Sequence, residues 1–279
     1  MTDTQARMPR FMTLAEAAAL VPDGARLALG GMTIYRRPVA FALELLRRQP
    51  RPQGLTLVNF TAGYESDLLV GGCCVSTVRS VYFGLESFGL APMFTEMAAS
   101  GALRIVEETE ASIVMGLRAR TAGVGFMPSH AWIGTDLPRL RPDVKTITDP
   151  YTGEPLMAFP AIPLDVTVLH GLEADPYGTV KLSNNLGIDL ELVYAADLVI
   201  VTVERLVDEV RRSLDGVLVP APGIDVIVHT PNGAWPTSCY PDYPVAGGEL
   251  LRYVEACSAG DFNAYLAQLL AGPDGSSQR

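Results

Sequence analysis

Three glutamates lie where an α/β protein places its chemistry. Glu107, Glu108 and Glu110 follow an expected strand at residues 103–106 and precede an expected helix at residues 111–121. Ligands gather at the carboxyl ends of parallel strands, and a helix N-terminus favours an ionised carboxylate, so a glutamate there could act as a base or nucleophile. Glu110 directly precedes the apolar helix and is the best of the three candidates. Acidic residues also cap helices for structural reasons alone, and the sequence by itself favours that interpretation for each.

A glycine pair forms the second candidate site. Gly30-Gly31 ends an expected strand that begins at Arg26, and Arg36-Arg37-Pro38 precedes an expected helix at residues 39–48. Glycine lets the backbone approach a ligand closely, and a helix N-terminus offers free N–H groups to an anion or an oxyanion. An ordinary β-to-α turn is the alternative, because a lone glycine pair is a weak signal.

Two polar loops are further candidates. Glu86 stands between Gly84 and Gly89, where a carboxylate could be held in a tight loop or could simply accept hydrogen bonds from nearby backbone. Ser183 and Asn184 belong to the run GTVKLSNNLG at residues 178–187 and could bind a substrate carboxylate or amide. Loops rich in Asn and Ser are also ordinary turns, so the sequence leaves both uses open.

Familiar catalytic and cofactor motifs do not occur in the chain. It has no G-x-G-x-x-G, no Walker A sequence, no H-E-x-x-H and no G-x-S-x-G, so dinucleotide, nucleotide, zinc-protease and serine-hydrolase templates have no local support. The three histidines are far apart and are expected to be structural. The four cysteines form no C-x-x-C pair, which predicts reduced thiols and no metal.

The composition bounds the class of protein. The chain has 279 residues, 48% of them hydrophobic, and a net charge of −10 from 31 acidic and 21 basic residues. This is enough apolar sequence for a sizeable core, and the negative charge argues against nucleic acid or an anionic membrane as a partner. The N-terminal residues have no apolar core of signal-peptide length, and no apolar run reaches the ~18 residues of a membrane span. We therefore expect a cytoplasmic protein.

Short apolar runs alternate with amphipathic segments along the chain. Thr13 and Glu16 have the spacing of a capping box before a helix. Further strands are expected at residues 55–60, 78–83, 166–170, 198–203, 216–219 and 225–228, and further helices at 66–71, 92–100, 189–195, 248–257 and 262–271. This alternation predicts a mostly parallel, open α/β sheet with helices on both faces. Residues 1–271 are expected to form a single domain, with an irregular excursion at 138–163 and a disordered tail at 272–279.

An ordered set of segments resembles the A subunit of glutaconate CoA-transferase and its relatives, the family I CoA-transferases. The set runs from about Thr13 to about Tyr265, and each piece is weak while the order is specific. The segments are residues 28–31 (ALGG) with Arg37-Pro38, 66–72 with 78–86, 90–94 through Glu110 to Leu117, 126–128 with 134–137, 159–161, 165–166, His170, 174–175, 177–178, 195–197 with 201–204, 233 with 236–238, and 241–243.

The resemblance implies a NagB/RpiA/CoA-transferase-like fold and an enzyme that moves CoA between an acyl-CoA and a carboxylic acid. Family enzymes form an acyl-glutamyl anhydride and then a glutamyl-CoA thioester. In two-subunit members the glutamate belongs to the B subunit, while the A subunit contributes glycine-loop amides toward an oxyanion. This chain lacks a Ser-Glu-Asn-Gly type motif. A B subunit in an A2B2 assembly is therefore expected, with a CoA thioester as substrate and no permanently bound cofactor.

Two other functions remain open. A related pair from actinobacteria opens the last steroid rings as a hydrolase, and its catalytic glutamate resembles Glu110, which would make Glu110 a general base. A small-molecule-binding or isomerase-like protein could also share only the fold. One departure concerns specificity, because the family often has a histidine where this chain reads Asn-Gly-Ala-Trp-Pro at residues 232–236.

Overall fold

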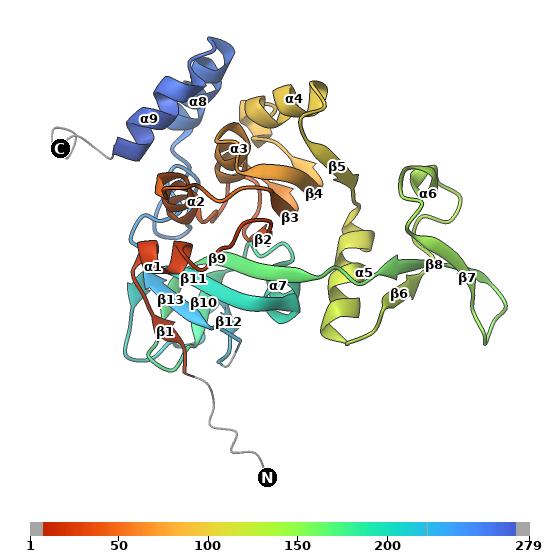
Figure 1. Ribbon diagram of the computed structural model, residues 1–279. Helices are drawn as coiled ribbons and strands as arrows, with labels where there is room; N and C mark the ends of the chain where they lie inside the picture. The colour runs from red at the N-terminus through yellow and green to blue at the C-terminus, as the bar shows by residue number, and fades with distance from the viewer. Residues whose placement is uncertain (1–7, 222, 272–279) are drawn as a thin grey trace.

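The central feature of the fold is a ten-stranded sheet. A computed structural model describes residues 8–221 and 223–271 (Figure 1). Eight strands follow the order β1-β13-β11-β9-β2-β3-β4-β5 and every neighbouring pair is parallel, while β10 and β12 pair antiparallel beside β9. The strands are β1 (Arg10–Phe11), β2 (Arg26–Leu29), β3 (Leu55–Ala62), β4 (Val75–Phe83), β5 (Arg104–Glu107), β9 (Leu164–Ala174), β10 (Val180–Ser183), β11 (Ala196–Leu206), β12 (Gly216–Val219) and β13 (Val226–His229).

Helices cover both faces of this sheet, as the sequence predicted. The described helices are α1 (Leu14–Ala18), α2 (Val39–Arg47), α3 (Tyr64–Gly71), α4 (Pro92–Ala99), α5 (Glu110–Thr121), α6 (Leu137–Leu140), α7 (Asp189–Ala195), α8 (Gly247–Ser258) and α9 (Phe262–Ala271), with a 3₁₀ turn, η1 (Glu86–Phe88). Leu27 and Leu29 pack toward α1, α2 and α3 on one face, whereas Ala28 packs toward α5 and α7 on the other. This alternation follows from the two-residue period of a strand. Each buried leucine contributes about 1.5–3 kcal/mol.

Side-chain hydrogen bonds fix the starts of two helices. The expected capping box begins α1, where Glu16 N donates to Thr13 Oγ1 at 3.3 Å and Thr13 N donates to Glu16 Oε2 at 2.8 Å. Such caps stabilise a helix by ~1 kcal/mol. The start of α4 is capped by a residue of α3, because Asp67 Oδ1 accepts a hydrogen bond from Phe94 N at 2.6 Å.

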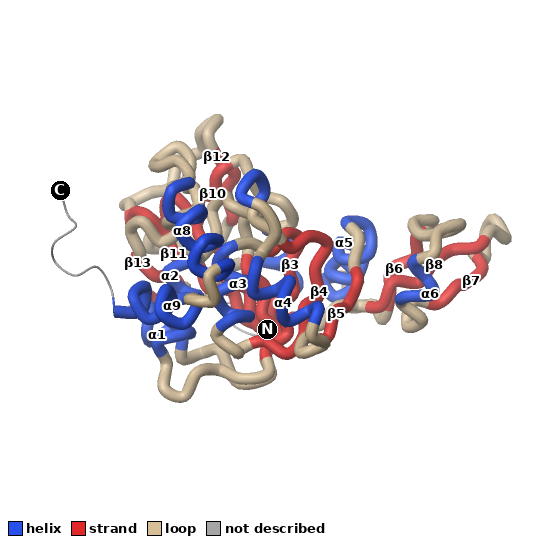
Figure 2. The backbone as a smooth tube through the Cα atoms, turned by 90° about the horizontal axis from the view of Figure 1, so that it is seen from above, coloured by secondary structure: helices blue, strands red, loops and turns tan. Residues whose placement is uncertain are grey.

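Residues 138–163, expected to be irregular, contain regular structure instead. The strands β6 (Phe126–Ser129), β7 (Lys145–Thr148) and β8 (Pro155–Pro160) form a separate antiparallel sheet in the order β6-β8-β7. With α6 they make an arm that projects beyond α5 (Figures 1 and 2). Trp132 and Phe159 pack edge to face at the centre of this arm, with ring centroids 5.0 Å apart. The chain therefore continues its secondary structure outside the main sheet.

The other predicted elements are present, with shifted ends. β9 and β11 extend to Ala174 and Leu206, several residues beyond the expected strands, and β10 was not expected. The expected tail at 272–279 lies outside the described residues. Among those described, no helix combines the length and hydropathy that crossing a membrane requires.

Candidate active site

The glycine loop after β2 is folded back tightly on the sheet. Gly31 has φ +82°, and a Cβ there would lie 2.5 Å from Arg36 O, so only glycine fits without a shift of the backbone. Gly30 N donates to Val168 O and Gly31 N donates to Asp189 Oδ1, both at 2.9 Å. Both amides have acceptors within the chain in this structure, and the oxyanion role expected from the sequence stays a prediction. The pair lets the loop pass close to β9 and α7.

Two buried arginines clamp this loop. Arg37 donates to Gly31 O at 2.9 Å, to Thr61 O at 2.8 Å and to Glu65 Oε1 at 2.6 Å. Its side chain is fully buried, so it holds β3, α3 and the glycine loop together rather than reaching a ligand in this state.

Arg36, which the sequence analysis grouped with Arg37, has a similar role on the other side of the loop. It donates to His170 O at 2.7 Å and to Asn185 O at 3.0 Å, and it forms a buried ion pair with Asp189. The loop is therefore fixed from both sides.

Glu86 lies close to the same loop. Thr33 Oγ1 donates to Glu86 Oε1 at 2.6 Å, although the two residues are 53 positions apart. Both have left-handed backbone conformations, with φ of +44° at Thr33 and +54° at Glu86, and Arg36 has φ +54°. Left-handed conformations cost a non-glycine residue about 1–3 kcal/mol and concentrate at functional sites. The carboxyl edge of β2 and β4 thus holds strained backbone at three non-glycine residues.

A cleft of about 660 Å³ opens beside this loop, within the usual range for ligand sites. The predicted residues Ser183 and Asn184 both line it, and Tyr35 of the strained loop lines it as well. Asn184 Nδ2 donates to Leu214 O at 2.8 Å, which fixes the side-chain amide. The full lining is Tyr35, Ser183, Asn184, Asn185, Asp215, Ser238, Tyr240, Pro244 and Val245.

A buried polar network supports one wall of the cleft. His170 Nε2 lies 2.7 Å from Glu204 Oε1, and His170 Nδ1 lies 2.8 Å from Thr202 Oγ1. Tyr243 donates its hydroxyl hydrogen to Glu204 Oε1 at 2.5 Å, and Asn232 N donates to Glu204 Oε2 at 2.7 Å. The network therefore ties β9 and β11 to the loop at 230–243, which carries the cleft residues Ser238 and Tyr240.

The protonation states within the network follow from burial. Burial lowers the pKa of His170 against the opposing effect of the Glu204 hydrogen bond, which keeps the imidazole neutral near pH 7. Burial alone would raise the pKa of Glu204, but the hydrogen bonds from His170 and Tyr243 hold it below its ordinary value. A neutral histidine beside an ionised glutamate is consistent with the expected structural role of His170.

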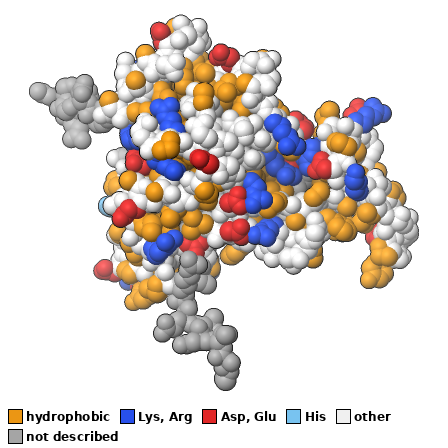
Figure 3. Space-filling model, viewed as in Figure 1, with side chains coloured by type: hydrophobic (Ala, Val, Ile, Leu, Met, Phe, Trp, Pro, Cys, Tyr) orange, Lys and Arg blue, Asp and Glu red, His pale blue; other side chains and the backbone are white. Residues whose placement is uncertain are grey.

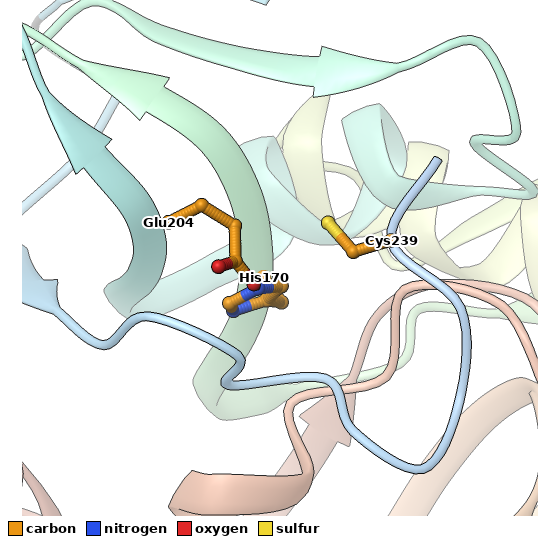
Figure 4. Close-up of side chains that lie close together, drawn as sticks. All are labelled: His170, Glu204 and Cys239. Atoms are coloured by element: carbon orange, nitrogen blue, oxygen red, sulfur yellow. The ribbon is translucent and has the colours of Figure 1, made fainter. Parts of the chain in front are cut away.

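His170, Glu204 and Cys239 also come close enough to suggest a metal site (Figure 4), with one ligand atom of each within 4.8 Å of the others. Their chemistry fits hydrogen bonding better. The 2.7 Å separation of His170 Nε2 and Glu204 Oε1 is a hydrogen-bond distance, and the same carboxylate also accepts hydrogen bonds from Tyr243 and Asn232.

The three glutamates at the start of α5 separate into two groups. Glu108 is buried, accepts hydrogen bonds from Arg79 Nε at 2.6 Å and Arg141 Nη1 at 2.8 Å, and is structural. Glu107 and Glu110 are exposed. Among the described residues, Glu110 does not line the cleft. Of the other predicted residues, Gly30, Gly31 and Arg37 belong to the loop after β2, Glu86 is hydrogen-bonded to that loop, and Ser183 and Asn184 line the cleft.

The chain is similar to characterised enzyme subunits over most of its length. It is 33% identical over 240 residues to the A subunit of 3-oxoadipate CoA-transferase from Pseudomonas knackmussii, covering 85% of this chain and 84% of that one. It is 30% identical over 263 residues to the cholesterol ring-cleaving hydrolase IpdA subunit of Mycobacterium tuberculosis, covering 88% and 87%.

Solved structures show the same architecture. A variant of the decarboxylase AibA/AibB matches with a TM-score of 0.87 and 32% identity, over 95% of this chain and 99% of that one. Glutaconate coenzyme A-transferase from Acidaminococcus fermentans matches with a TM-score of 0.84 and 28% identity, over 93% and 88%. The family model for coenzyme A transferase matches residues 11–230. The chain belongs to the coenzyme A transferase family, within which its relatives include A subunits.

Proposed function

We propose that this chain is the A subunit of a heteromeric CoA-transferase that moves CoA between an acyl-CoA and a carboxylic acid. A B subunit supplies the nucleophilic glutamate, and the CoA thioester is a substrate rather than a bound cofactor. The similarity to the A subunit of a 3-oxoadipate CoA-transferase over 85% of the chain supports this assignment.

The residues that line the cleft support a catalytic glutamate that comes from the B subunit rather than from this chain. Its described lining contains one carboxylate, Asp215, and otherwise neutral polar or apolar side chains. Serine and asparagine side chains can hydrogen-bond an acyl group or a substrate carboxylate, but this lining offers no glutamate to attack a thioester. A transferase site built here is therefore completed by a glutamate from another chain.

The test is to trap the covalent intermediate on the assembled enzyme. The chain is co-expressed with a candidate B subunit, incubated with an acyl-CoA, and treated with hydroxylamine, which converts a glutamyl thioester to a hydroxamate. Mass spectrometry should locate the hydroxamate on a glutamate of the partner. A hydroxamate on this chain would contradict the proposal.

A second candidate is a hydrolase that opens a ring of a CoA thioester with Glu110 as general base. The exposed position of Glu110 at the start of α5 and the 30% identity to an IpdA subunit favour it. Consumption of the acyl-CoA without a covalent adduct on either chain would support this function over the transferase. The third interpretation, a binding or isomerase-like protein, rested on fold alone, and the family match reaches further than fold.

The assembly and location complete the proposal. We propose an A2B2 complex in the cytoplasm, with residues 1–271 acting as one domain. Light scattering of the co-purified subunits measures the stoichiometry, and a 1:1 dimer would revise it.

A further inference from the structure

Four polar side chains form one row across the amino ends of four neighbouring strands. Arg26 of β2 is in register with Thr56 of β3, Thr56 with Thr77 of β4, and Thr77 with Arg104 of β5. Residues paired side by side in a sheet point to the same face. Two hydroxyl groups therefore stand between two guanidinium groups, at the end of the sheet opposite the cleft.

This row forms one wall of a cavity of about 480 Å³. Arg79, one pleat further along β4, and Arg141, directly after α6, also line it. Figure 3 shows Lys and Arg side chains gathered where the main body meets the arm. The full lining is Arg26, Thr56, Thr77, Arg79, Arg104, Ile105, Val106, Leu140, Arg141, Pro142 and Asp143.

Positive charge is in excess in this cavity, although the protein has a net charge of −10. Glu108 is shared by Arg79 and Arg141, whereas Arg26 pairs with Asp165. Arg141 also pairs with Asp143, at 2.7 Å. Three carboxylates thus face four arginines.

Arg104 is the arginine of the four that has no carboxylate partner among the described residues. The hydroxyl groups of Thr56 and Thr77 likewise make no hydrogen bond to a described residue. Burial, and then the nearby Arg141, lower the pKa of Arg79 against the opposing effect of Glu108. The cavity thus presents cationic and neutral hydrogen-bond donors that its own carboxylates do not satisfy.

We propose that this cavity binds the phosphate group of a small molecule, either inorganic phosphate or a nucleotide. Arginine presents planar paired N–H donors that match phosphate oxygens, and the threonine hydroxyls add two neutral donors between them. The volume lies within the range of small-molecule sites. The site is separate from the cleft at the carboxyl edge, so this inference does not depend on the reaction assigned to that cleft.

Titration calorimetry on the complex with the B subunit tests the site. The probes are inorganic phosphate, adenosine 5′-monophosphate and adenosine, at constant ionic strength. Phosphate and the monophosphate should bind saturably and adenosine should not. Tighter binding of the monophosphate would identify a nucleotide as the ligand, whereas equal binding would identify free phosphate, and both outcomes support the proposal. No saturable binding of either phosphate probe would overturn it.

Two variants and one control locate the binding. Arg104→Gln should weaken phosphate binding at least about tenfold, because a charge-assisted hydrogen bond is lost, and Thr77→Val should weaken it less. Arg139→Gln is the control, because Arg139 is a highly exposed arginine of α6 outside the cavity lining. Equal affinity in Arg104→Gln and the control would overturn the assignment. So would weaker binding of the B subunit to Arg104→Gln without any phosphate binding, which would mean that acidic groups of the partner fill the cavity.

Discussion

The imidazole of His170 and the carboxylate of Glu204 meet inside the protein at 2.7 Å, on neighbouring parallel strands. His170 is in register with Thr202, so Glu204, two residues later, points to the same face and reaches the other ring nitrogen. Through Tyr243 and Asn232 the same carboxylate holds the loop that carries Ser238 and Tyr240. The shape of the cleft therefore depends on a network that does not itself line the cleft.

Tyr243→Phe should destabilise the protein by about 1–2 kcal/mol, because Glu204 loses one donor and Ala234 N loses its acceptor. The measurement is the free energy of unfolding in urea. Tyr240→Phe is the matched control, since Tyr240 lies in the same loop and is 72% exposed, and it should change stability by less than about 0.5 kcal/mol. Equal losses in the two variants would show that the network contributes nothing specific.

Gly31→Ala should cost at least about 2 kcal/mol and reduce activity of the complex, because the new Cβ meets backbone atoms and φ is +82°. Gly248→Ala serves as the control, as a Cβ at Gly248 meets nothing within 4 Å. Thermal unfolding and steady-state rates report the two effects. An unchanged melting temperature in Gly31→Ala would contradict the tight approach of this loop.

The raised pKa of the buried Asp67 carboxyl should make the free energy of unfolding depend on pH. Burial raises the pKa of Asp67 from 3.8 to about 6, against the hydrogen bonds from Tyr253, Phe94 and Met93. Between these two values the folded protein holds a proton that the unfolded chain releases, so this contribution is complete below about pH 4 and is lost as the pH rises through about 6. The loss amounts to about 3 kcal/mol.

Urea unfolding of the wild type and of Asp67→Asn, at about pH 4, 5 and 6, isolates this contribution. The stability of the wild type relative to the variant should fall across the series. Asp136→Asn, at a highly exposed aspartate, should show no such trend. A constant difference between wild type and Asp67→Asn would mean that the Asp67 carboxyl titrates alike in both states.

Glu110→Gln separates the two candidate reactions. In a ring hydrolase it should lower the rate at least ~100-fold, the usual contribution of a positioned general base, whereas in a transferase with its nucleophile in the B subunit the loss should be much smaller. Glu107→Gln is the control, because Glu107 is also exposed and lies three residues earlier. A severe loss with intact assembly in a proven transferase would contradict the proposed division of labour.

The strands were predicted most directly from the sequence where apolar runs were long enough to be buried on both faces, as in β9 and β11. The strands of the arm were not predicted. They are short and partly exposed, and β6 and β8 contain prolines, at Pro128, Pro155 and Pro160. Half-exposed strands with proline look like loops in a single sequence.

The candidate site was only partly predictable. Glycine pairs, loop carboxylates and Asn-Ser runs are visible locally, so Gly31, Glu86 and Ser183 could be named. The Glu204 network was missed because its members lie 34 and 39 positions from one another, and only strand register brings them together. The available signal was polar residues at alternate positions inside apolar strands, namely His170 in β9 and Thr202 with Glu204 in β11.

The clamp formed by Arg36 and Arg37 has a thermodynamic consequence. Arg36 bonds to His170, 134 positions later, and Arg37 N bonds to Thr237, 200 positions later. No short segment can form the cleft by itself. Local unfolding that breaks the contact of Arg36 with His170, or that of Arg37 with Thr237, therefore disrupts the cleft. A ligand bound there stabilises only conformations in which these contacts are formed. Its protection of backbone amides against hydrogen exchange should therefore extend beyond the residues it touches, to β9 and to the loop at 230–243.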